Sequence, residues 1–193
     1  IGYQNRPLLF DLNIRLPEIL YDRVIEVSER LDAKGNIIRN LDKESVRKAL
    51  KEAKADGING VAIAFMHSYL NPIHEEKIAK IAIEESFSQI SVSHKVSPLM
   101  KLVGRGDTTV VDAYLSPILK RYVDQVSSEL DNTKSTKLMF MQSNGGLTDA
   151  NLFQGKDALL SGPAGGVVSM VQTGLQAGFS KLIGFDMGGT STD

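Results

Sequence analysis

The first hundred residues change their hydrophobic period twice. Across residues 23–41, apolar and polar residues alternate on both sides of the sequence AKGN (33–36), which predicts two β-strands joined by a glycine-containing turn. Residues 43–55 then carry an apolar stripe with helical spacing, with Asp42 as a suitable N-cap and Gly57 as a suitable glycine after the helix. This pattern predicts a hairpin followed by one amphipathic helix.

Two short apolar runs, with a helix between them, indicate a layered α/β region. Residues 61–66 are predicted as a strand buried on both faces, and residues 90–94 as a second short strand. Between them, residues 71–87 have a helical pattern, with Asn71 as the N-cap and Pro72 at the first helical position. Alternating helices and near-continuous apolar strands are typical of α/β folds.

The second half of the chain begins with a predicted break at residues 104–107, where two glycines interrupt the pattern. A helical pattern follows from residue 108 to residue 131, and Pro117 inside it predicts either a kink or two helices that meet there. Apolar runs at 138–142 and 181–187 predict two more strands, separated by a helix over 162–178.

Composition excludes several classes of protein. The 193 residues are 42% hydrophobic and 23% charged, with a net charge of −1, whereas a dedicated nucleic-acid binder needs clustered excess Lys and Arg. The chain has no cysteine, so it cannot form a disulfide, and a reducing cytoplasm is the simplest setting. No apolar run is long enough to span a bilayer, and the first residues do not resemble a signal peptide. We therefore expect neither nucleic acid nor membrane as a partner.

The last ten residues, GFDMGGTSTD, are the strongest candidate for chemistry. Gly188 and Gly189 allow backbone N–H groups to approach an anion, and residues 190–192 add three hydroxyl groups. Asp186 could hold a hydrated Mg²⁺ or orient a water molecule, and Asp193 could be a second metal-binding acid. The alternative is a β-hairpin turn with a hydrogen-bonded aspartate.

Two further glycine loops strengthen the phosphate interpretation. The sequence SNGG (143–146) follows a predicted strand, and SGPAGG (161–166) opens a predicted helix, whose N-terminus is suited to an anion. Gly165 and Gly166 could instead permit close helix packing. Because ligands collect at the carboxyl ends of strands, we expect the three loops to converge on one cleft. The candidate cofactor-binding residues are Ser143, Asn144, Gly145, Gly146, Gly162, Gly165, Gly188, Gly189, Thr190, Ser191 and Thr192.

Three histidines and one tripeptide are weaker candidates. His67, His74 and His94 have no spacing that supplies a third metal ligand, so structural roles are the better interpretation. The tripeptide RGD (105–107) resembles an adhesion motif, which we discard in a cysteine-free chain, and the basic sequence RKALKEAK is read as a solvated helix face. Gln142 and Asn144 are better placed to line a cleft, where they could hold a lactam or a phosphate edge.

Five segments, in this order, resemble one family: HSYLNPIHE, TTVVDAYLSP, MQSNGGL, LSGPAGGVV and GFDMGGTSTD. The last loop, helix and strand resemble the connecting helix and second phosphate loop of the actin-like ATPase superfamily. The five segments together are similar to the ATP-dependent hydantoinase A and 5-oxoprolinase family, and their finer wording resembles its 5-oxoprolinase branch. The resemblance implies an α/β fold, with an additional α/β module over 1–101 and part of an actin-like (ribonuclease H-like) ATPase core over 102–193.

The resemblance also implies an activity. Members of the 5-oxoprolinase branch open 5-oxo-L-proline to L-glutamate while hydrolysing ATP to ADP and phosphate, in glutathione metabolism, with Mg²⁺ and possibly K⁺. Gly188, Gly189 and Thr190 would then contact phosphate, and Asp186 would contact Mg²⁺ or water. The alternatives are an N-methylhydantoinase-type cyclic amidase, an acyl or sugar kinase of the same superfamily, and a non-catalytic nucleotide-binding fragment.

The family begins with another phosphate loop that precedes anything in this chain, and it continues beyond the last residue here. The chain therefore resembles an internal fragment with one phosphate loop of two. We expect it to bind no cofactor tightly and to be inactive alone. A separately encoded remainder or a homo-oligomer is a possible partner, alongside the small-molecule substrate, 5-oxoproline or a related cyclic amide.

Overall fold

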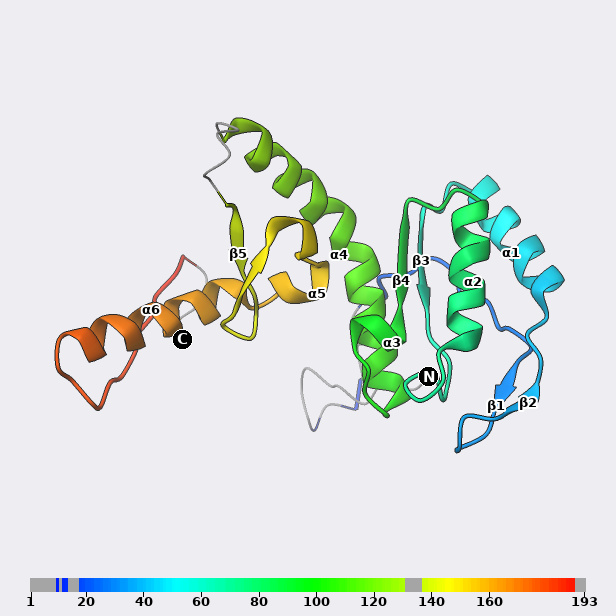
Figure 1. The fold of residues 1–193 in the computed structure, drawn as a ribbon, viewed down its shortest axis with the longest axis horizontal. Helices are drawn as coiled ribbons and strands as arrows, with labels where there is room; N and C mark the ends of the chain where they lie inside the picture. Colours follow the sequence, from blue (N-terminus) through cyan, green and yellow to red (C-terminus); the bar gives the residue numbers. More distant parts are fainter. Residues whose placement is uncertain (1–9, 11, 14–17, 131–136, 190–193) are drawn as a thin grey trace. The chain divides into compact units, whose positions relative to one another are not determined.

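A computed structural model describes residues 10, 12–13, 18–130 and 137–189. The chain forms two compact units, Ile1–Tyr114 and Leu115–Asp193, whose elements are labelled in Figure 1. The sequence places the division somewhat earlier, between residues 101 and 102. The described residues form two two-stranded β-sheets in the first unit and one in the second.

The first unit begins with the predicted hairpin. Strands β1 (Arg30–Leu31) and β2 (Ile37–Arg39) pair antiparallel, and both are shorter than the alternating pattern suggests. The turn between them is stabilised by Asp32, whose Oδ1 accepts hydrogen bonds of 2.8 Å from the N–H groups of Lys34 and Asn36. The pKa of Asp32 is lowered, mainly by a hydrogen bond from the side chain of Asn36 and further by the two backbone bonds.

Helix α1 (Lys43–Ala55) has the predicted ends. The Asp42 carboxylate accepts a 3.1 Å hydrogen bond from the N–H of Ser45, which satisfies one of the free donors of the first turn. Gly57 follows the helix with φ of 86°, a conformation that glycine adopts without strain. The N-cap and the terminal glycine therefore define this helix as the sequence predicted.

Strands β3 (Gly60–Ile63) and β4 (Gln89–Val92) form a parallel pair connected through helix α2 (Ile73–Glu84). Figure 1 shows α1 and α2 on one side of this pair and the first part of α4 on the other. The apolar core of the unit lies between the strands and the first two helices. It consists of Leu41, Val46, Leu50, Ala53, Ile63, Ile78, Ile81, Ala82, Phe87 and Val92.

Three boundaries differ from the sequence-based prediction. Strand β3 ends at Ile63, three residues early, because the following residues turn to meet a buried glutamate described below. Helix α2 begins at Ile73, with Pro72 as the capping residue, although Asn71 Oδ1 still accepts a 3.2 Å hydrogen bond from the Ile73 N–H. Residues 93–94, predicted as strand, begin the short helix α3 (Ser93–Val96).

Helix α4 (Leu102–Glu129) is the largest departure. It runs without a break through residues 104–107, so the predicted loop there is wrong. Glycine inside a helix costs roughly 0.5–1 kcal/mol relative to alanine, and the buried contacts of Arg105 offset that cost. Pro117 lies inside the same helix, so the alternative of two separate helices is also wrong.

The second unit contains an antiparallel hairpin and two more helices. Strands β5 (Met139–Met141) and β6 (Leu147–Asp149) pair, and the 3₁₀ turn η1 (Ala150–Leu152), α5 (Gly155–Ala158) and α6 (Ser161–Gln176) follow. An aromatic cluster packs the hairpin, with Phe140 stacked on Phe153 at 5.0 Å between ring centroids. Helix α5 packs closely on α4, where the N–H of Gly155 donates a 3.0 Å hydrogen bond to Ser116 Oγ.

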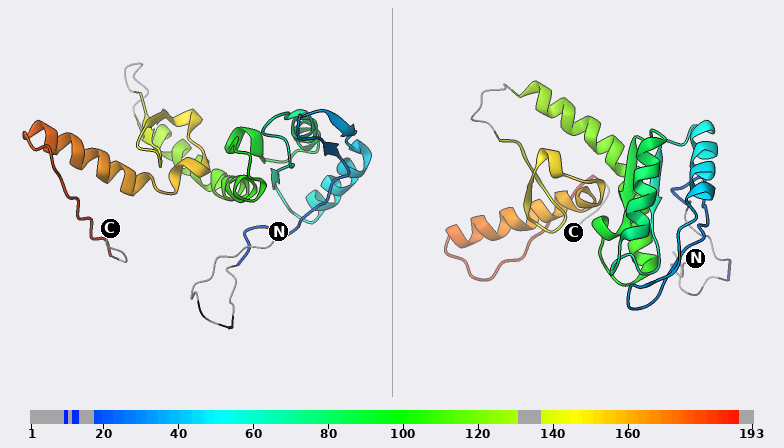
Figure 2. Two further views of the ribbon diagram at one scale, coloured as in Figure 1. Left: turned by 90° about the horizontal axis from the view of Figure 1, so that it is seen from below. Right: turned by 45° about the vertical axis from the view of Figure 1, so that its right-hand side comes forward.

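Residues 181–185, predicted as a buried strand, do not form one. They run back along α6, as Figure 2 shows, and Ile183 and Phe185 are 98% and 76% exposed. A strand is stable only when its backbone groups pair with a neighbour, and no strand within the described residues pairs with this segment over 181–185. The apolar pattern of residues 181–185 is that of a strand, but no neighbouring strand among the described residues pairs with it.

Candidate functional site

The turn at residues 142–146, which we call the 142–146 turn, connects β5 to β6. It is closed by a 2.8 Å hydrogen bond from the N–H of Gln142 to the carbonyl of Gly146, and by a 2.9 Å bond from the N–H of Gly145 to the carbonyl of Gln142. Asn144 Oδ1 accepts a 2.8 Å bond from the Gly146 N–H. Gly145 has φ of 81°, so glycine is required at this position.

Ser143 joins this turn to the start of α6. Its hydroxyl donates a 2.7 Å hydrogen bond to the carbonyl of Asp157 and accepts a 2.9 Å bond from the N–H of Leu160, the residue before α6. Its own N–H also donates to the Asp157 carbonyl, at 2.7 Å. Two of the three predicted glycine loops therefore meet at the N-terminus of α6.

Helix α6 begins at Ser161, one residue before the predicted start, so the glycine-containing sequence SGPAGG lies within the helix. Residues 161–165 form its first turn, and the Ser161 hydroxyl donates a 2.9 Å bond to the carbonyl of Ala158. A Cβ added to Gly165 would lie 3.7 Å from Met141 Cγ, so that glycine faces the hairpin. A Cβ added to Gly162 would meet nothing within 4 Å.

The Asp186 carboxylate also lies on α6. The chain runs antiparallel to the helix after residue 180, and a Cβ built on Gly166 would be 3.8 Å from Asp186 Oδ2. Among the described residues, this carboxylate has no protein hydrogen-bond partner. Gly188 and Gly189 follow in exposed chain, whereas Thr190, Ser191, Thr192 and Asp193 lie outside the described residues. The 142–146 turn and Asp186 each lie against the first half of α6, since a Cβ on Gly145 would be 3.3 Å from Val168 Cγ2. We call the turn, the first half of α6 and Asp186 together the α6 site.

The α6 site is compatible with a nucleotide phosphate and Mg²⁺. Asp186 is exposed, so its carboxylate is accessible from solvent. Mg²⁺ in phosphoryl-transfer enzymes is held by one or two carboxylates together with phosphate oxygens and water, so a single described carboxylate fits that pattern. Within the described part of the chain, no cluster of three histidine or acidic side chains could form a metal site made by protein alone.

Asp149 is a further ionisable group of the hairpin. Its Oδ1 accepts 3.0 Å hydrogen bonds from the N–H and the side-chain amide of Asn151, and both lower its pKa. The Asp149 carboxylate therefore already has hydrogen-bond donors at the end of β6, and the bonds it accepts stabilise the following 3₁₀ turn.

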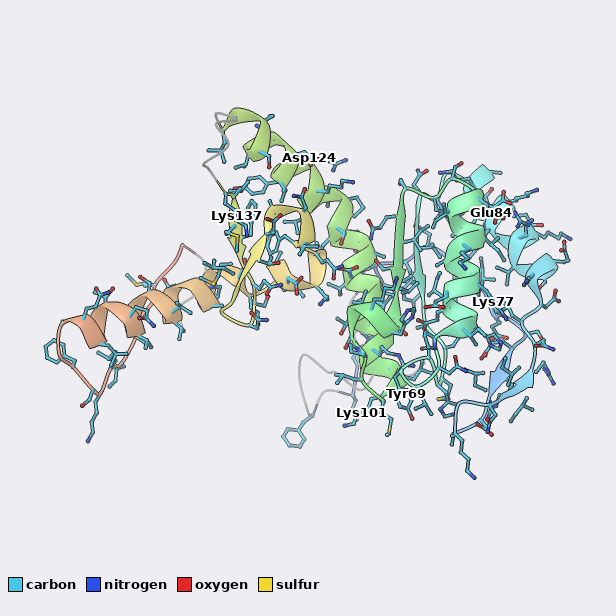
Figure 3. The ribbon with its side chains drawn as sticks, viewed as in Figure 1. Tyr69, Lys77, Glu84, Lys101, Asp124 and Lys137 are labelled. Atoms are coloured by element: carbon cyan, nitrogen blue, oxygen red, sulfur yellow. The ribbon has the colours of Figure 1, made fainter. Side chains whose placement is uncertain are left out.

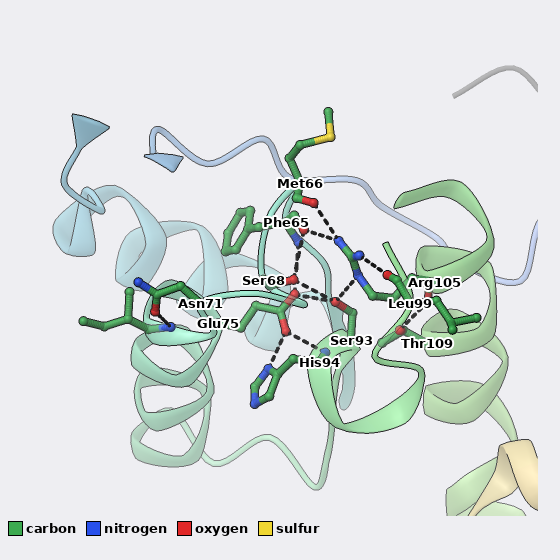
Figure 4. A network of polar contacts seen from close by, with 11 residues as sticks. Phe65, Met66, Ser68, Asn71, Glu75, Ser93, His94, Leu99, Arg105 and Thr109 are labelled. Atoms are coloured by element: carbon green, nitrogen blue, oxygen red, sulfur yellow. Dashed lines mark hydrogen bonds and ion pairs between the residues drawn. The ribbon is translucent and has the colours of Figure 1, made fainter. Parts of the chain in front are cut away.

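The first unit contains a buried polar network that the sequence did not predict (Figure 4). The Arg105 side chain is fully buried, and its five N–H groups reach Ser93 Oγ and four backbone carbonyls, those of Phe65, Met66, Leu99 and Met100. Burial lowers the pKa of Arg105, while nearby Glu75 and Tyr69 act in the opposite direction. Because every N–H group has an acceptor, the network joins α4 to the strand ends rather than presenting a free charge.

Glu75 is the acidic member of that network and is also fully buried. Its carboxylate accepts bonds from the N–H groups of Phe65 and His94, from Ser93 Oγ at 2.5 Å and from His94 Nδ1 at 2.7 Å. His74 has a similar partner, since its Nδ1 lies 2.7 Å from Glu29 Oε2. Each of the two histidines therefore pairs with a glutamate. The RGD tripeptide lies in helix α4, and its arginine is buried.

A shallow groove lies between α1 and α2 in the first unit. Figure 3 labels Lys77 and Glu84 at this groove, which encloses about 200 Å³. Only one apolar side chain, Ile81, lines it, and Arg47 is held across it by Glu84 and Glu85. A nucleotide base needs an apolar surface for stacking, so we do not place the nucleotide here.

Comparison with known proteins places the chain in a family of ATP-dependent enzymes. Two family models match it: the hydantoinase/oxoprolinase N-terminal region over residues 1–86, and hydantoinase/oxoprolinase over residues 105–193. The chain therefore belongs to the hydantoinase/oxoprolinase family.

Within that family the chain is similar to 5-oxoprolinases. It is 42% identical to the 5-oxoprolinase of Saccharomyces cerevisiae and 42% identical to 5-oxoprolinase 1 of Arabidopsis thaliana. Each alignment covers 100% of this chain and 17% of the relative, so the chain spans about a sixth of their length.

Two solved structures share its fold. The ATP-dependent caprolactamase from Pseudomonas jessenii matches 86% of this chain and 25% of its own, with a TM-score of 0.75 and 30% identity. A nucleotide-free acetone carboxylase matches 86% of this chain and 24% of its own, with a TM-score of 0.76 and 26% identity. These neighbours agree with the predicted α/β fold of the hydantoinase and actin-like ATPase class. No helix within the described residues is long and apolar enough to cross a membrane.

Proposed function

We propose that this chain supplies part of the nucleotide site of an ATP-dependent cyclic amide hydrolase that opens 5-oxo-L-proline to L-glutamate. Residues 102–193 would contribute the ATPase core and residues 1–101 the adjoining α/β module. The 42% identity to two 5-oxoprolinases supports the substrate class, and the cytoplasmic degradation of 5-oxoproline in glutathione metabolism is the setting we propose.

The observation that carries this proposal is the position of Asp186. Its carboxylate lies close to Gly166 in α6, and Ser143 of the 142–146 turn bonds the residue before that helix. A helix N-terminus favours a negative charge such as that of a phosphate, and Asp186 would hold Mg²⁺, which would supply positive charge to the reaction. Gly188, Gly189 and the hydroxyl groups of residues 190–192 would complete the contacts to phosphate.

The chemistry follows from the weakness of a lactam as an electrophile. Transfer of the γ-phosphoryl group of ATP to the amide oxygen would convert that oxygen into a leaving group and make the ring carbon open to attack by water. The C–N bond then breaks, the nitrogen takes up a proton, and the γ-carboxyl group remains as an acyl phosphate. A second water would hydrolyse that acyl phosphate, so that glutamate, phosphate and ADP are the products. Mg²⁺, with K⁺ as a possible second ion, would supply the positive charge that stabilises the transferring phosphoryl group.

The test is ADP release by the native protein that carries this chain, measured with ATP, Mg²⁺, K⁺ and 5-oxoproline. We expect 5-oxoproline-dependent release that Asp186→Asn lowers at least a hundredfold, because positioning of the metal and phosphates dominates phosphoryl transfer. Asp124→Asn is the matched control, since Asp124 is an exposed acid of the same unit on α4. Release that depends on caprolactam or a hydantoin, and not on 5-oxoproline, would contradict the substrate assignment.

A further inference from the structure

Most backbone N–H groups of the 142–146 turn already have hydrogen-bond acceptors within the protein. The N–H groups of Ser143, Gly145 and Gly146 donate to the Asp157 carbonyl, the Gln142 carbonyl and Asn144 Oδ1, at 2.7, 2.9 and 2.8 Å. A glycine-rich turn binds phosphate through free backbone N–H groups. Three of the four residues of SNGG therefore have no free amide for a ligand in this conformation.

The Ser143 hydroxyl is also engaged. It donates to the Asp157 carbonyl and accepts from the Leu160 N–H, so its one proton is used. A phosphate oxygen needs a donor, and Ser143 can supply one only by giving up its bond to Asp157. The residue is half-buried against the α5–α6 connection, which fits a structural contact better than a ligand contact.

Asn144 differs from its neighbours. It is exposed, and its Oδ1 is fixed by the Gly146 N–H, which leaves the side-chain NH₂ group directed away from the turn. Neither that NH₂ group nor the Asn144 backbone N–H has a hydrogen-bond acceptor among the described residues. Among the four residues of SNGG, Asn144 is thus the one with unused donors within the described part of the chain, and Ser143 holds it beside the N-terminus of α6.

We propose that Ser143 is a positioning residue and that Asn144 is the contact of this turn with a phosphate group of ATP, to which its side-chain NH₂ donates a hydrogen bond. This assignment rests on the proposed function, because it takes the α6 site as the nucleotide site. It gives Ser143 and Asn144 different roles: Asn144 binds the ligand, and Ser143 acts by holding Asn144 in place.

Kinetics of the native protein test the ligand contact. A hydrogen bond to a charged group contributes roughly 1.5–3 kcal/mol, so Asn144→Ala should raise the KM for ATP about tenfold or more. The KM for 5-oxoproline should stay within about twofold of wild type. Asn144→Asp should be worse than Asn144→Ala, because a carboxylate repels phosphate. An unchanged KM for ATP in Asn144→Ala, or a rise confined to the KM for 5-oxoproline, would overturn the assignment.

The positioning role has its own variants and its own readout. Ser143→Ala should raise the KM for ATP in the same way, and Ser143→Thr, which keeps the hydroxyl, should restore it to within a few-fold of wild type. In the 193-residue chain, amide hydrogen exchange at Leu160 should become about tenfold faster in Ser143→Ala than in wild type, because the N–H loses its acceptor. Equal exchange rates at Leu160 would refute the positioning role, whatever the kinetics show.

The two proposals fail in different ways. Absence of any ATP hydrolysis by the native protein would sink the proposed function, while hydrogen exchange at Leu160 would still decide the role of Ser143. In that case, titration of the 193-residue chain with millimolar ATP, followed through the side-chain NH₂ signals of Asn144, decides the ligand contact. A shift of those signals on addition of ATP supports the contact, and the absence of any shift rejects it.

Discussion

Replacement of Arg105 by methionine should destabilise the first unit far more than loss of an exposed arginine does. Methionine has a similar length but carries no charge and no donor, so the change removes all five hydrogen bonds from the guanidinium group. It leaves four backbone carbonyls without that partner and the fully buried Glu75 without its nearby cation.

The magnitude follows from burial. Removing one partner of a buried ionic network costs about 3–5 kcal/mol, because the remaining charge and polar groups stay buried without compensation. A typical domain has only about 5–15 kcal/mol of unfolding free energy, so this single change would remove a large share of it. Arg47→Met is the matched control. Arg47 pairs with Glu84 and Glu85 at the surface with 35% of its side chain exposed, and such a pair contributes about 0–1 kcal/mol.

The assay has to report on the first unit alone, because two units need not unfold together. Native-state hydrogen exchange of the β3 and β4 amides, for example those of Ile63 and Val92, measures the opening free energy of that sheet. We expect that free energy to fall by about 3–5 kcal/mol in Arg105→Met and by less than about 1 kcal/mol in Arg47→Met. Equal effects of the two substitutions would refute the reasoning that burial gives the Arg105 network its weight.

Two further predictions concern the second unit, and a third concerns the chain as a whole. Gly155→Ala should destabilise it by about 1–3 kcal/mol in thermal unfolding, since the new Cβ would lie 2.8 Å from the backbone N of Ser116, whereas Gly162→Ala meets no atom within 4 Å and should be neutral or slightly stabilising. The Asp149 carboxyl should titrate below the usual aspartate value in a ¹³C NMR experiment, because Asn151 hydrogen-bonds the charged form. Its contribution to stability is then present above the unfolded-state pKa and is lost as the pH falls through the folded-state pKa, and a titration at or above the usual value would contradict this. The 193-residue chain by itself should show neither ATP hydrolysis nor 5-oxoproline opening, with ATP affinity on the order of millimolar or weaker, and turnover near one per second in an ADP-release assay would contradict that expectation.

Local signals predicted the parts of the fold that local interactions determine. Helix α1 was predictable because its N-cap, Asp42, and the glycine that follows it, Gly57, each act within a few residues. The β1–β2 hairpin was predictable for the same reason, since Asp32 bonds to the two backbone groups of its own turn. Capping and turn chemistry are properties of short segments, so a single sequence carries them in full.

The failures come from contacts between distant residues. The two glycines around Arg105 indicate a break, but the arginine reaches carbonyls as far away as Phe65, and that burial keeps the helix intact. Residues 181–185 have a strand pattern, but a pattern cannot supply the neighbouring strand. In the α6 site, the glycine loops were visible in the sequence, while the engagement of the Ser143 hydroxyl with Asp157 and Leu160 was not. Only the folded chain distinguishes a free donor from a used one.

The buried face of the first part of α4 is polar, and its hydrogen bonds determine the register of the helix as well as its stability. Arg105, Thr109 and Asp112 are spaced by four and three residues, are all buried, and lie on one side of the helix. Asp112 accepts a 2.6 Å bond from Ser91 Oγ, and Arg105 donates to Ser93 Oγ, two residues further along the chain. Apolar surfaces can slide past each other at small cost, whereas directional bonds at both ends of a seven-residue interval match in one register only. One inserted or deleted residue between them would rotate Asp112 by about 100° around the axis and break the match. The interval from Arg105 to Asp112 can therefore accept substitutions, but it cannot accept an insertion or a deletion.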